Sequence, residues 1–272
     1  MSREAPEGGI REDGAAPSRV GAHIVAIGGF DPGGGAGVVR DFLTARAFGA
    51  SVTLVPTAWT EQSPASVQAI DARDPAACYR AVRGALDGHA APAVKIGMLP
   101  DAAAAVAVGR ALETFGGPIV LDPVLRASNG GALWSGDPSA LLALAARVTL
   151  LTPNADEASI LTGLPMETAA DAVAAGRALC ARGIGAVLVK GGHLGGTAAT
   201  DTLVGPTGVR LFTGARRPGG AAVRGTGCAL ATAIAVGLAR GLPLDEAITA
   251  AKAWLGDALA AAVDVGGERH LP

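Results

Sequence analysis

This sequence of 272 residues has no excess of basic charge, because its 22 lysine and arginine residues are balanced by 24 aspartate and glutamate residues, a formal charge of −2. A chain without a concentrated basic face has no general electrostatic means of holding nucleic acid. Apolar runs are also short, and none approaches the roughly 18 residues that a membrane helix needs. We therefore expect neither a nucleic acid nor a membrane among the partners of this protein.

Cysteine is scarce as well, with three widely separated residues, Cys78, Cys180 and Cys228, and no Cys-x-x-Cys pair. This pattern excludes a disulfide scaffold or a thiolate zinc site, and it suits a reducing compartment. Residues 1–22 mix charged residues, glycine and proline without the apolar core of a secretory signal. We interpret them as a mobile tail before one domain at 23–272, and we expect a cytoplasmic protein.

Apolar residues make up 50% of the chain and charged residues 17%, so a sizeable core can be buried. Short apolar runs, typical of buried parallel strands, alternate with segments of helical period. The predicted strands are His23–Gly28, Val52–Pro56, Ala93–Met98, Pro118–Leu121, Val148–Leu151 and Ala186–Lys190. The predicted helices are Ala36–Phe48, Pro75–Leu86, Ala102–Phe115, Pro138–Ala146, Ala155–Leu161, Ala169–Arg182, Thr226–Ala239 and Leu244–Val263. Thr200–Val204 and Val209–Phe212 predict a β-hairpin, so we expect an α/β fold with a parallel sheet and an antiparallel edge.

Six glycines fall within residues 28–37, between the first predicted strand and the first predicted helix. Open α/β sheets bind ligands beyond the carboxyl ends of their strands, and glycine lets the backbone approach a ligand closely. The loop matches neither the Walker pattern nor Gly-x-Gly-x-x-Gly, which argues against both familiar nucleotide-binding routes. A flexible turn in a glycine-rich protein is the alternative interpretation.

Gly225, Thr226, Gly227 and Cys228 immediately precede an apolar helix. Small residues at a helix start leave backbone N–H groups pointing together at the positive end of the helix dipole, which predicts an anion site. In this first turn the pKa of the Cys228 thiol is expected to be lowered. The alternatives are that Thr226 only caps the helix and that Cys228 is only a small buried residue.

Lysine is rare, because only Lys95, Lys190 and Lys252 occur among the 22 basic residues. Such a chain keeps lysine where a compact point charge on a slim stem is wanted. Lys95 and Lys190 end predicted strands, where the ligand edge of the sheet lies. A solvated surface position is the alternative, and it fits Lys252 best.

Two amides and two carboxylates also follow predicted strands. Gln62 offers a donor and an acceptor together, which suits the edge of a heteroaromatic ring, and Asn154 lies at the same sheet edge. Asp122 and Glu157 are candidates for holding Mg²⁺ near phosphates, although either could instead cap a helix. Together with the glycine loop and the anion site, these groups are typical of phosphoryl transfer from a nucleotide.

The sequence resembles the hydroxymethylpyrimidine/phosphomethylpyrimidine kinases of thiamine biosynthesis, in the ribokinase-like superfamily. The similarity covers roughly residues 23–262. The matching motifs, in chain order, are residues 28–37, Thr57-Ala58 with Gln62, Lys95-Ile96-Gly97-Met98-Leu99, Leu121-Asp122-Pro123-Val124, Thr152-Pro153-Asn154 with Glu157, Val189-Lys190-Gly191-Gly192-His193, Gly225-Thr226-Gly227-Cys228 and Ala251-Lys252-Ala253-Trp254. The resemblance implies a three-layer α/β/α sandwich with a mostly parallel central sheet.

The resemblance also implies ATP and Mg²⁺ as cofactors, a homodimer, and two successive phosphorylations. The 5-hydroxymethyl group of an aminopyrimidine is phosphorylated first, and the monophosphate then becomes the diphosphate. Gln62 is expected to bind the pyrimidine edge, in a pocket formed with Gly29, Asp31, Ala36, Thr60, Met98, Val124 and Cys228. Lys190, Thr226 and Lys252 are expected to contact phosphates, and Asn154, Glu157 and Asp122 to organise Mg–ATP.

The sequence departs from the family pattern at several positions, which bears on substrate preference and on whether both steps occur. Phe30 replaces a small hydroxyl residue, Val39 a common glutamine and Leu43 a common lysine, and the usual Gly-rich, Pro-containing C-terminal signature is missing. These departures leave open a pyridoxal or related vitamin kinase of the same fold, and a pyrimidine- or nucleotide-binding sensor without turnover. A Cys-nucleophile hydrolase would need a histidine base, and His23, His89 and His193 have no supporting pattern.

We also formulate a hypothesis on catalysis. Cys228 occupies the position of a catalytic base, while the N–H groups of Gly225, Gly227 and their neighbours, with Lys190, stabilise charge on the transferred phosphoryl group. Because the transition state is loose, a weak base could suffice for the alcohol, and a phosphate acceptor needs none. On this view Cys228→Ala damages the first phosphorylation more than the second.

Overall fold

The computed structural model describes residues 21–62, 66–88, 93–127, 129–192, 198–216, 219–220, 223–265 and 267–272. All but the last two residues of the predicted N-terminal tail therefore lie outside the described residues, as do His89 and His193. The strands are β1 His23–Phe30, β2 Ser51–Gln62, β3 Val67–Ala72, β4 Ala93–Ile96, β5 Ile119–Leu121, β6 Leu150–Leu151, β7 Val187–Val189, β8 Ala198–Gly205, β9 Gly208–Ala215, β10 Val223–Arg224, β11 Val263–Val265 and β12 Glu268–His270. The helices are α1 Gly37–Ala47, α2 Pro75–Gly88, α3 Ala102–Ala111, α4 Ser139–Ala145, α5 Ala155–Thr162, α6 Ala169–Cys180, α7 Thr226–Ala239 and α8 Leu244–Ala260.

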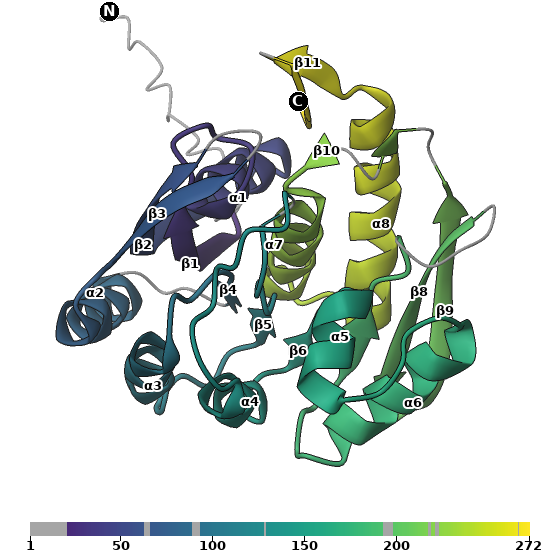
Figure 1. Cartoon of the computed structure of the whole chain (residues 1–272), viewed down its shortest axis with the longest axis horizontal. Helices are drawn as coiled ribbons and strands as arrows, with labels where there is room; N and C mark the ends of the chain where they lie inside the picture. Colours follow the sequence, from purple (N-terminus) through teal and green to yellow (C-terminus); the bar gives the residue numbers. More distant parts are fainter. Residues whose placement is uncertain are drawn as a thin grey trace, which may run out of the picture.

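Nine of these strands form one central sheet in the order β3-β2-β1-β4-β5-β6-β7-β8-β9 (Figure 1). The strands from β2 to β7 are parallel, and β3, β8 and β9 join antiparallel at the two edges. The six predicted parallel strands, the hairpin and all eight predicted helices are confirmed. Strand β3 was not predicted, because Val67–Ala72 is a mostly exposed edge strand without a buried apolar run.

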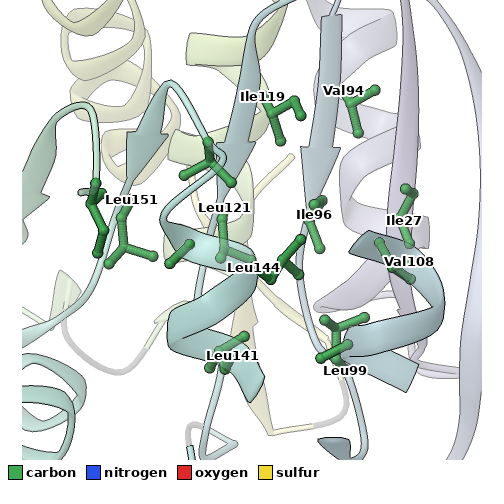
Figure 2. Packing of buried hydrophobic residues seen from close by; sticks show 14 of the residues in the cluster. Ile27, Val94, Ile96, Leu99, Val108, Ile119, Leu121, Leu141, Leu144 and Leu151 are labelled. Carbon is green, nitrogen blue, oxygen red and sulfur yellow. The ribbon is translucent and has the colours of Figure 1, made fainter. Parts of the chain in front are cut away.

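Alternation along the buried strands divides the core into two layers. Val25 and Ile27 of β1 face helices α2 to α6, and this layer includes the side chains that Figure 2 draws between the strands and helices α3 and α4. Ile24 of the same strand faces α1 and α7, and Leu188 of β7 faces α7 and α8. The fold is therefore the predicted three-layer α/β/α sandwich.

A second, three-stranded sheet has the order β10-β12-β11. Strand β10 lies directly before α7, and it pairs in parallel with β12 near the end of the chain. This small sheet brings residues 263–265 and 268–270 to the start of α7 (Figure 1). Among the described residues, no helix is both long and apolar enough to cross a bilayer.

Candidate active site

A cavity of about 930 Å³ opens at the carboxyl ends of the parallel strands, where an α/β sheet binds ligands. Apart from Lys95, which the sequence placed at the ligand edge of the sheet, every residue with a predicted catalytic, substrate-, phosphate- or metal-binding role lines this one cavity. These residues are Gly29, Asp31, Ala36, Thr60, Gln62, Met98, Asp122, Val124, Asn154, Glu157, Lys190, Gly225, Thr226, Gly227, Cys228 and Lys252. Residues as far apart in sequence as Gly29 and Lys252 therefore line the same cavity, although their individual roles stay predictions.

The glycine loop after β1 is held closed by Asp31, whose side chain is 3% exposed. Its Oδ1 accepts a hydrogen bond from the N–H of Gly33 and its Oδ2 accepts one from the N–H of Ala36, both at 2.9 Å. Gly37 then starts α1 at φ +61°, and a Cβ there would lie 2.2 Å from the oxygen of Gly29. The loop is thus a turn fixed by side-chain hydrogen bonds and close backbone packing, which argues against the alternative interpretation as a flexible turn. Asp31 lines the cavity, but its bonds hold the loop.

Helix α7 begins at Gly225 in the left-handed conformation, with φ +73°. A Cβ at Gly225 would lie 2.0 Å from the oxygen of Gly35, so this residue joins the helix start to the glycine loop. As N-cap, Gly225 supplies no side chain to accept hydrogen bonds from the first-turn N–H groups of Thr226, Gly227 and Cys228. These groups and the helix dipole form a candidate anion site at the cavity wall.

Lys190, directly after β7, lies next to this helix start at the cavity wall. A Cβ on Gly227 would lie 3.1 Å from Lys190 Nζ and 3.4 Å from Asp122 Oδ2. Lys190 Nζ donates to Asp122 Oδ1 at 2.6 Å and lies 3.9 Å from Glu157 Oε2. Burial lowers the pKa of Lys190, but the two carboxylates outweigh it and raise that pKa, so the ammonium stays charged.

Glu157 sits at the third position of α5 and forms a capping box with Asn154. The Asn154 N–H donates to Glu157 Oε2, and the Glu157 N–H donates to Asn154 Oδ1, both at 2.8 Å. Glu157 therefore caps α5 and also lines the cavity, so the cap does not replace a ligand role. Asp122 accepts from the Thr152 hydroxyl at 3.1 Å and from Lys190. Burial raises the pKa of Glu157 and the Lys190 charge lowers it, and burial prevails, so that the pKa is about 7.

These carboxylates fit Mg²⁺ delivered with ATP. Mg²⁺ takes oxygen ligands and usually binds through one or two carboxylates together with substrate phosphates. Asp122 and Glu157 supply such oxygens on both sides of the Lys190 ammonium. In the part of the chain that the structure describes, no group of three or more His, Cys, Asp or Glu side chains could hold a metal.

The raised pKa of Glu157 predicts an acidic limb, that is, a fall in activity toward low pH, in the pH–activity profile. Below about pH 7 its carboxyl is protonated, and a neutral carboxyl is a poor ligand for Mg²⁺. We expect kcat/KM for ATP to fall by about tenfold per pH unit below that value, and Glu157→Gln to be weakly active and to lack the limb. Steady-state rates between about pH 5 and about pH 9 test this. Glu113→Gln, an exposed carboxylate outside the cavity, should keep the limb. A limb that survives in Glu157→Gln contradicts the assignment.

The same group makes stability depend on pH. The folded carboxyl holds its proton up to about pH 7, whereas the unfolded carboxyl loses it near 4.5. Between these values the folded state binds more protons, so the free energy of unfolding falls as the pH rises through this window. Glu157→Gln should flatten that part of the profile.

The expectation of a lowered thiol pKa at Cys228 is wrong. The side chain is buried, and burial raises its pKa to about 11, although the Lys95 charge lowers it. The desolvation penalty outweighs the helix start, because the thiolate would lie inside the protein wall. At neutral pH the group is therefore a protonated thiol.

Residues 31–272 match the protein family described as phosphomethylpyrimidine kinase. The chain belongs to this family. A hydroxymethylpyrimidine/phosphomethylpyrimidine kinase of Rhizobium meliloti is 41% identical over 248 residues, covering 89% of this chain and 91% of the relative. A protein of the same name from Escherichia coli is 36% identical over 246 residues, covering 88% and 91%. The family predicted from the sequence motifs is thus confirmed.

Two solved structures extend the comparison. A phosphomethylpyrimidine kinase of Clostridium difficile has a TM-score of 0.74 at 28% identity, covering 88% of this chain and 99% of that one. An ADP complex of Bacillus subtilis pyridoxal kinase has a TM-score of 0.82 at 25% identity, covering 92% and 96%. The predicted ribokinase-like fold is confirmed, and the protein is a phosphotransferase by family.

Of the two other lysines of this kinase, Lys252 lines the cavity, as the resemblance implied, and Lys95 does not. Lys95 is fully buried, and its Nζ donates to both carboxylate oxygens of Asp41 at 2.8 Å. Lys252 is no solvated surface residue, because its Nζ reaches into the cavity wall and donates to Asp201 Oδ2 at 2.5 Å. Asp201 Oδ1 also accepts from the N–H of Gly191, beside Lys190, at 2.8 Å. Sequence reasoning missed Asp201, whose one signal was its place in the predicted hairpin.

Arg224 was also missed, although it directly precedes Gly225. Its Nη2 donates to Gln62 Oε1 at 3.1 Å and to Asp31 Oδ2 at 3.2 Å, and its Nη1 donates to Glu268 Oε2 at 2.8 Å. The predicted acceptor residues Gln62 and Asp31 are therefore held from a position that none of the quoted motifs included.

Proposed function

We propose that this chain transfers the γ-phosphoryl group of ATP to the hydroxymethyl group of 4-amino-5-hydroxymethyl-2-methylpyrimidine, and then phosphorylates the monophosphate to the diphosphate, in thiamine biosynthesis. The observation that supports this best is the meeting of an acceptor-type group, Gln62, with a phosphate-type group, the start of α7 with Lys190, in one cavity. A donor and an acceptor molecule can bind there together, as phosphoryl transfer requires.

Each end of the cavity has its own part in this proposal. Gln62 binds the pyrimidine edge beside Thr60, Met98 and Val124, with the glycine loop against the ring. The N–H groups that open α7, together with Lys190 and Lys252, bind the phosphates. Asp122 and Glu157 would hold Mg²⁺, which supplies positive charge to the phosphate oxygens.

Catalysis on this site is chiefly positioning and electrostatic stabilisation. The acceptor oxygen bonds to the γ-phosphorus while the bond to the departing ADP breaks, and negative charge spreads over the transferred oxygens. The proton of a hydroxyl acceptor leaves late, to a phosphate oxygen or to solvent. The α7 amides and the Lys190 ammonium are already fixed around that position, so they need no reorganisation. The second acceptor is a phosphate, which uses the same electrostatics and needs no base.

The protonated thiol changes the expectation for Cys228→Ala. A base that is deprotonated only near pH 11 contributes little at neutral pH, so we expect both phosphorylations to slow by less than about tenfold and to similar extents. Rates with each acceptor at saturation, followed by ADP release, test this. A loss of about 10²-fold or more confined to the first step would restore the catalytic base.

A substrate panel tests the function itself. ADP release is measured with hydroxymethylpyrimidine, its monophosphate and pyridoxal side by side, with and without Mg²⁺. Pyridoxal is the second candidate acceptor, because the fold matches the Bacillus subtilis pyridoxal kinase closely. A much higher kcat/KM for pyridoxal than for either pyrimidine contradicts our assignment, and binding without ADP release would make the protein a sensor.

We also propose a homodimer in the cytoplasm. Phe42 and Leu43 on α1 and Trp59 on β2 expose 40–45% of their surface, which is apolar area that a second copy could cover. Sedimentation velocity on the full chain tests this, and a monomer at micromolar concentration contradicts it.

A further inference from the structure

The side chain of Arg224 is 11% exposed and lies between three partners from distant parts of the chain. It comes from β10, directly before the helix start that carries the anion site. Its Nη2 contacts Gln62 Oε1 and Asp31 Oδ2, and its Nη1 contacts both carboxylate oxygens of Glu268, at 2.8 and 3.1 Å. The charge of Arg224 is thus balanced by two carboxylates, which makes it a poor phosphate clamp and leaves a positioning role.

The contacts of the Gln62 amide admit only one of its two orientations. A guanidinium only donates hydrogen bonds, so the amide atom beside Arg224 must be the oxygen. At the other end, the Thr60 hydroxyl donates its one proton to the oxygen of Phe30 at 3.1 Å. That hydroxyl can therefore only accept from Gln62, whose Nε2 lies at 3.0 Å. Two independent partners fix the same orientation and leave one N–H and one lone pair of Gln62 for a ligand.

We propose that Arg224 is a positioning residue that sets the substrate specificity of the acceptor site through Gln62. An aminopyrimidine edge offers an N–H donor beside a ring-nitrogen acceptor. In the amide orientation that Arg224 and Thr60 fix, the amino group donates to the Gln62 oxygen and the ring nitrogen accepts from Gln62 Nε2. The corresponding 4-oxo ring offers an acceptor beside a ring N–H donor, and it would need the flipped amide. Flipping would set the Gln62 NH₂ group against Arg224, donor against donor, so the 4-oxo ring is rejected. This inference rests on the proposed function.

The C-terminal strand supports Arg224 in this role. Arg224 pairs with His270 in the register of β10 and β12, and Glu268 of β12 holds its guanidinium. Beyond β12, the carbonyls of Leu271 and Pro272 accept from the buried Arg40 of α1, each at 3.1 Å. The end of the chain is therefore fixed to both sides of the glycine loop, and the specificity of the site depends on Glu268 as well.

The test compares kcat/KM for the 4-amino substrate with that for its 4-oxo analogue, at saturating ATP. In Arg224→Met, the amide is free to turn. We expect the preference for the amino ring to fall by about tenfold or more, through a higher KM for the amino substrate, while the KM for ATP changes by less than about twofold. Arg210→Met is the matched control, because it removes the ion pair to Asp245 at a position outside the cavity, and its preference should stay unchanged.

Glu268→Gln gives a second route that keeps Arg224 and its contact with Gln62. We expect it to reduce the preference by about threefold, since the guanidinium loses one of its two carboxylates. An unchanged preference in both variants overturns the inference, and so does an equal loss for both rings accompanied by a raised KM for ATP. If the wild-type protein phosphorylates neither ring, the proposed function fails, and the inference fails with it.

Discussion

Lys190→Met is expected to lower kcat by about 10²- to 10³-fold for both phosphorylations. The Lys190 ammonium lies between Asp122 and Glu157 and directly faces Gly227 at the start of α7. It is therefore placed where negative charge gathers on the transferred group. Methionine matches the length of the lysine stem, so packing is largely kept while the charge is lost. The measurement is single-turnover phosphoryl transfer at saturating ATP with each acceptor.

Two further variants separate catalysis from stability. Removing the ammonium leaves Asp122 and Glu157 buried without a counter-charge, which raises the pKa of Glu157 further and should cost about 3 kcal/mol of stability. Adding Glu157→Gln removes that titrating group, so the double variant should recover thermal stability at alkaline pH while its kcat stays low. Lys190→Arg keeps the charge but is bulkier, and it should lie between the two. A kcat within about fivefold of wild type in Lys190→Met contradicts the electrostatic role.

Gly225→Ala is the second large effect, and it acts through the backbone. The residue has φ +73°, and the new Cβ would lie 2.0 Å from the oxygen of Gly35. The glycine loop and the start of α7 must then separate, which parts the acceptor site from the anion site. We expect activity on both acceptors to fall by more than about 10²-fold, because a misplacement of about 1 Å can cost that much. The free energy of unfolding should fall by about 2 kcal/mol or more.

Gly241→Ala is a matched control for this variant. Gly241 has φ +78°, nearly the same conformation, but no atom lies within 4 Å of an added Cβ, and the residue does not line the cavity. It should lose about 1–2 kcal/mol of stability and keep its activity. If Gly225→Ala behaves like Gly241→Ala in chemical denaturation and ADP-release assays, the close approach to Gly35 is not what holds the site together.

The elements that could be predicted from the sequence are those with a strong local signal. The buried parallel strands are continuous apolar runs, and the helices between them have a clear period, so their order and type were predictable. Strands β10 and β12 span only two and three residues, and they form by pairing with each other across the chain. No local pattern of this size carries such information.

The same distinction between local and long-range signals applies to the site. The residues that follow the parallel strands could be predicted as site residues, because these strands end at a common edge of the sheet. The ion pairs Arg224–Glu268 and Arg224–Asp31 join residues 44 and 193 positions apart, so no spacing could indicate them. For Cys228, position on a helix predicted a lowered pKa, but burial, which sequence alone does not give, reversed it. The rarity of lysine suggested that Lys95 binds a ligand, whereas its ion pair with the buried Asp41 places it in the protein core.

The small three-stranded sheet makes the acceptor end depend on a segment that the central sheet does not contain. Glu268 holds Arg224, and the carbonyls of Leu271 and Pro272 hold Arg40. None of these three supporting residues lines the cavity itself. A chain truncated after residue 267 should therefore still bind ATP, while its preference among acceptors is lost.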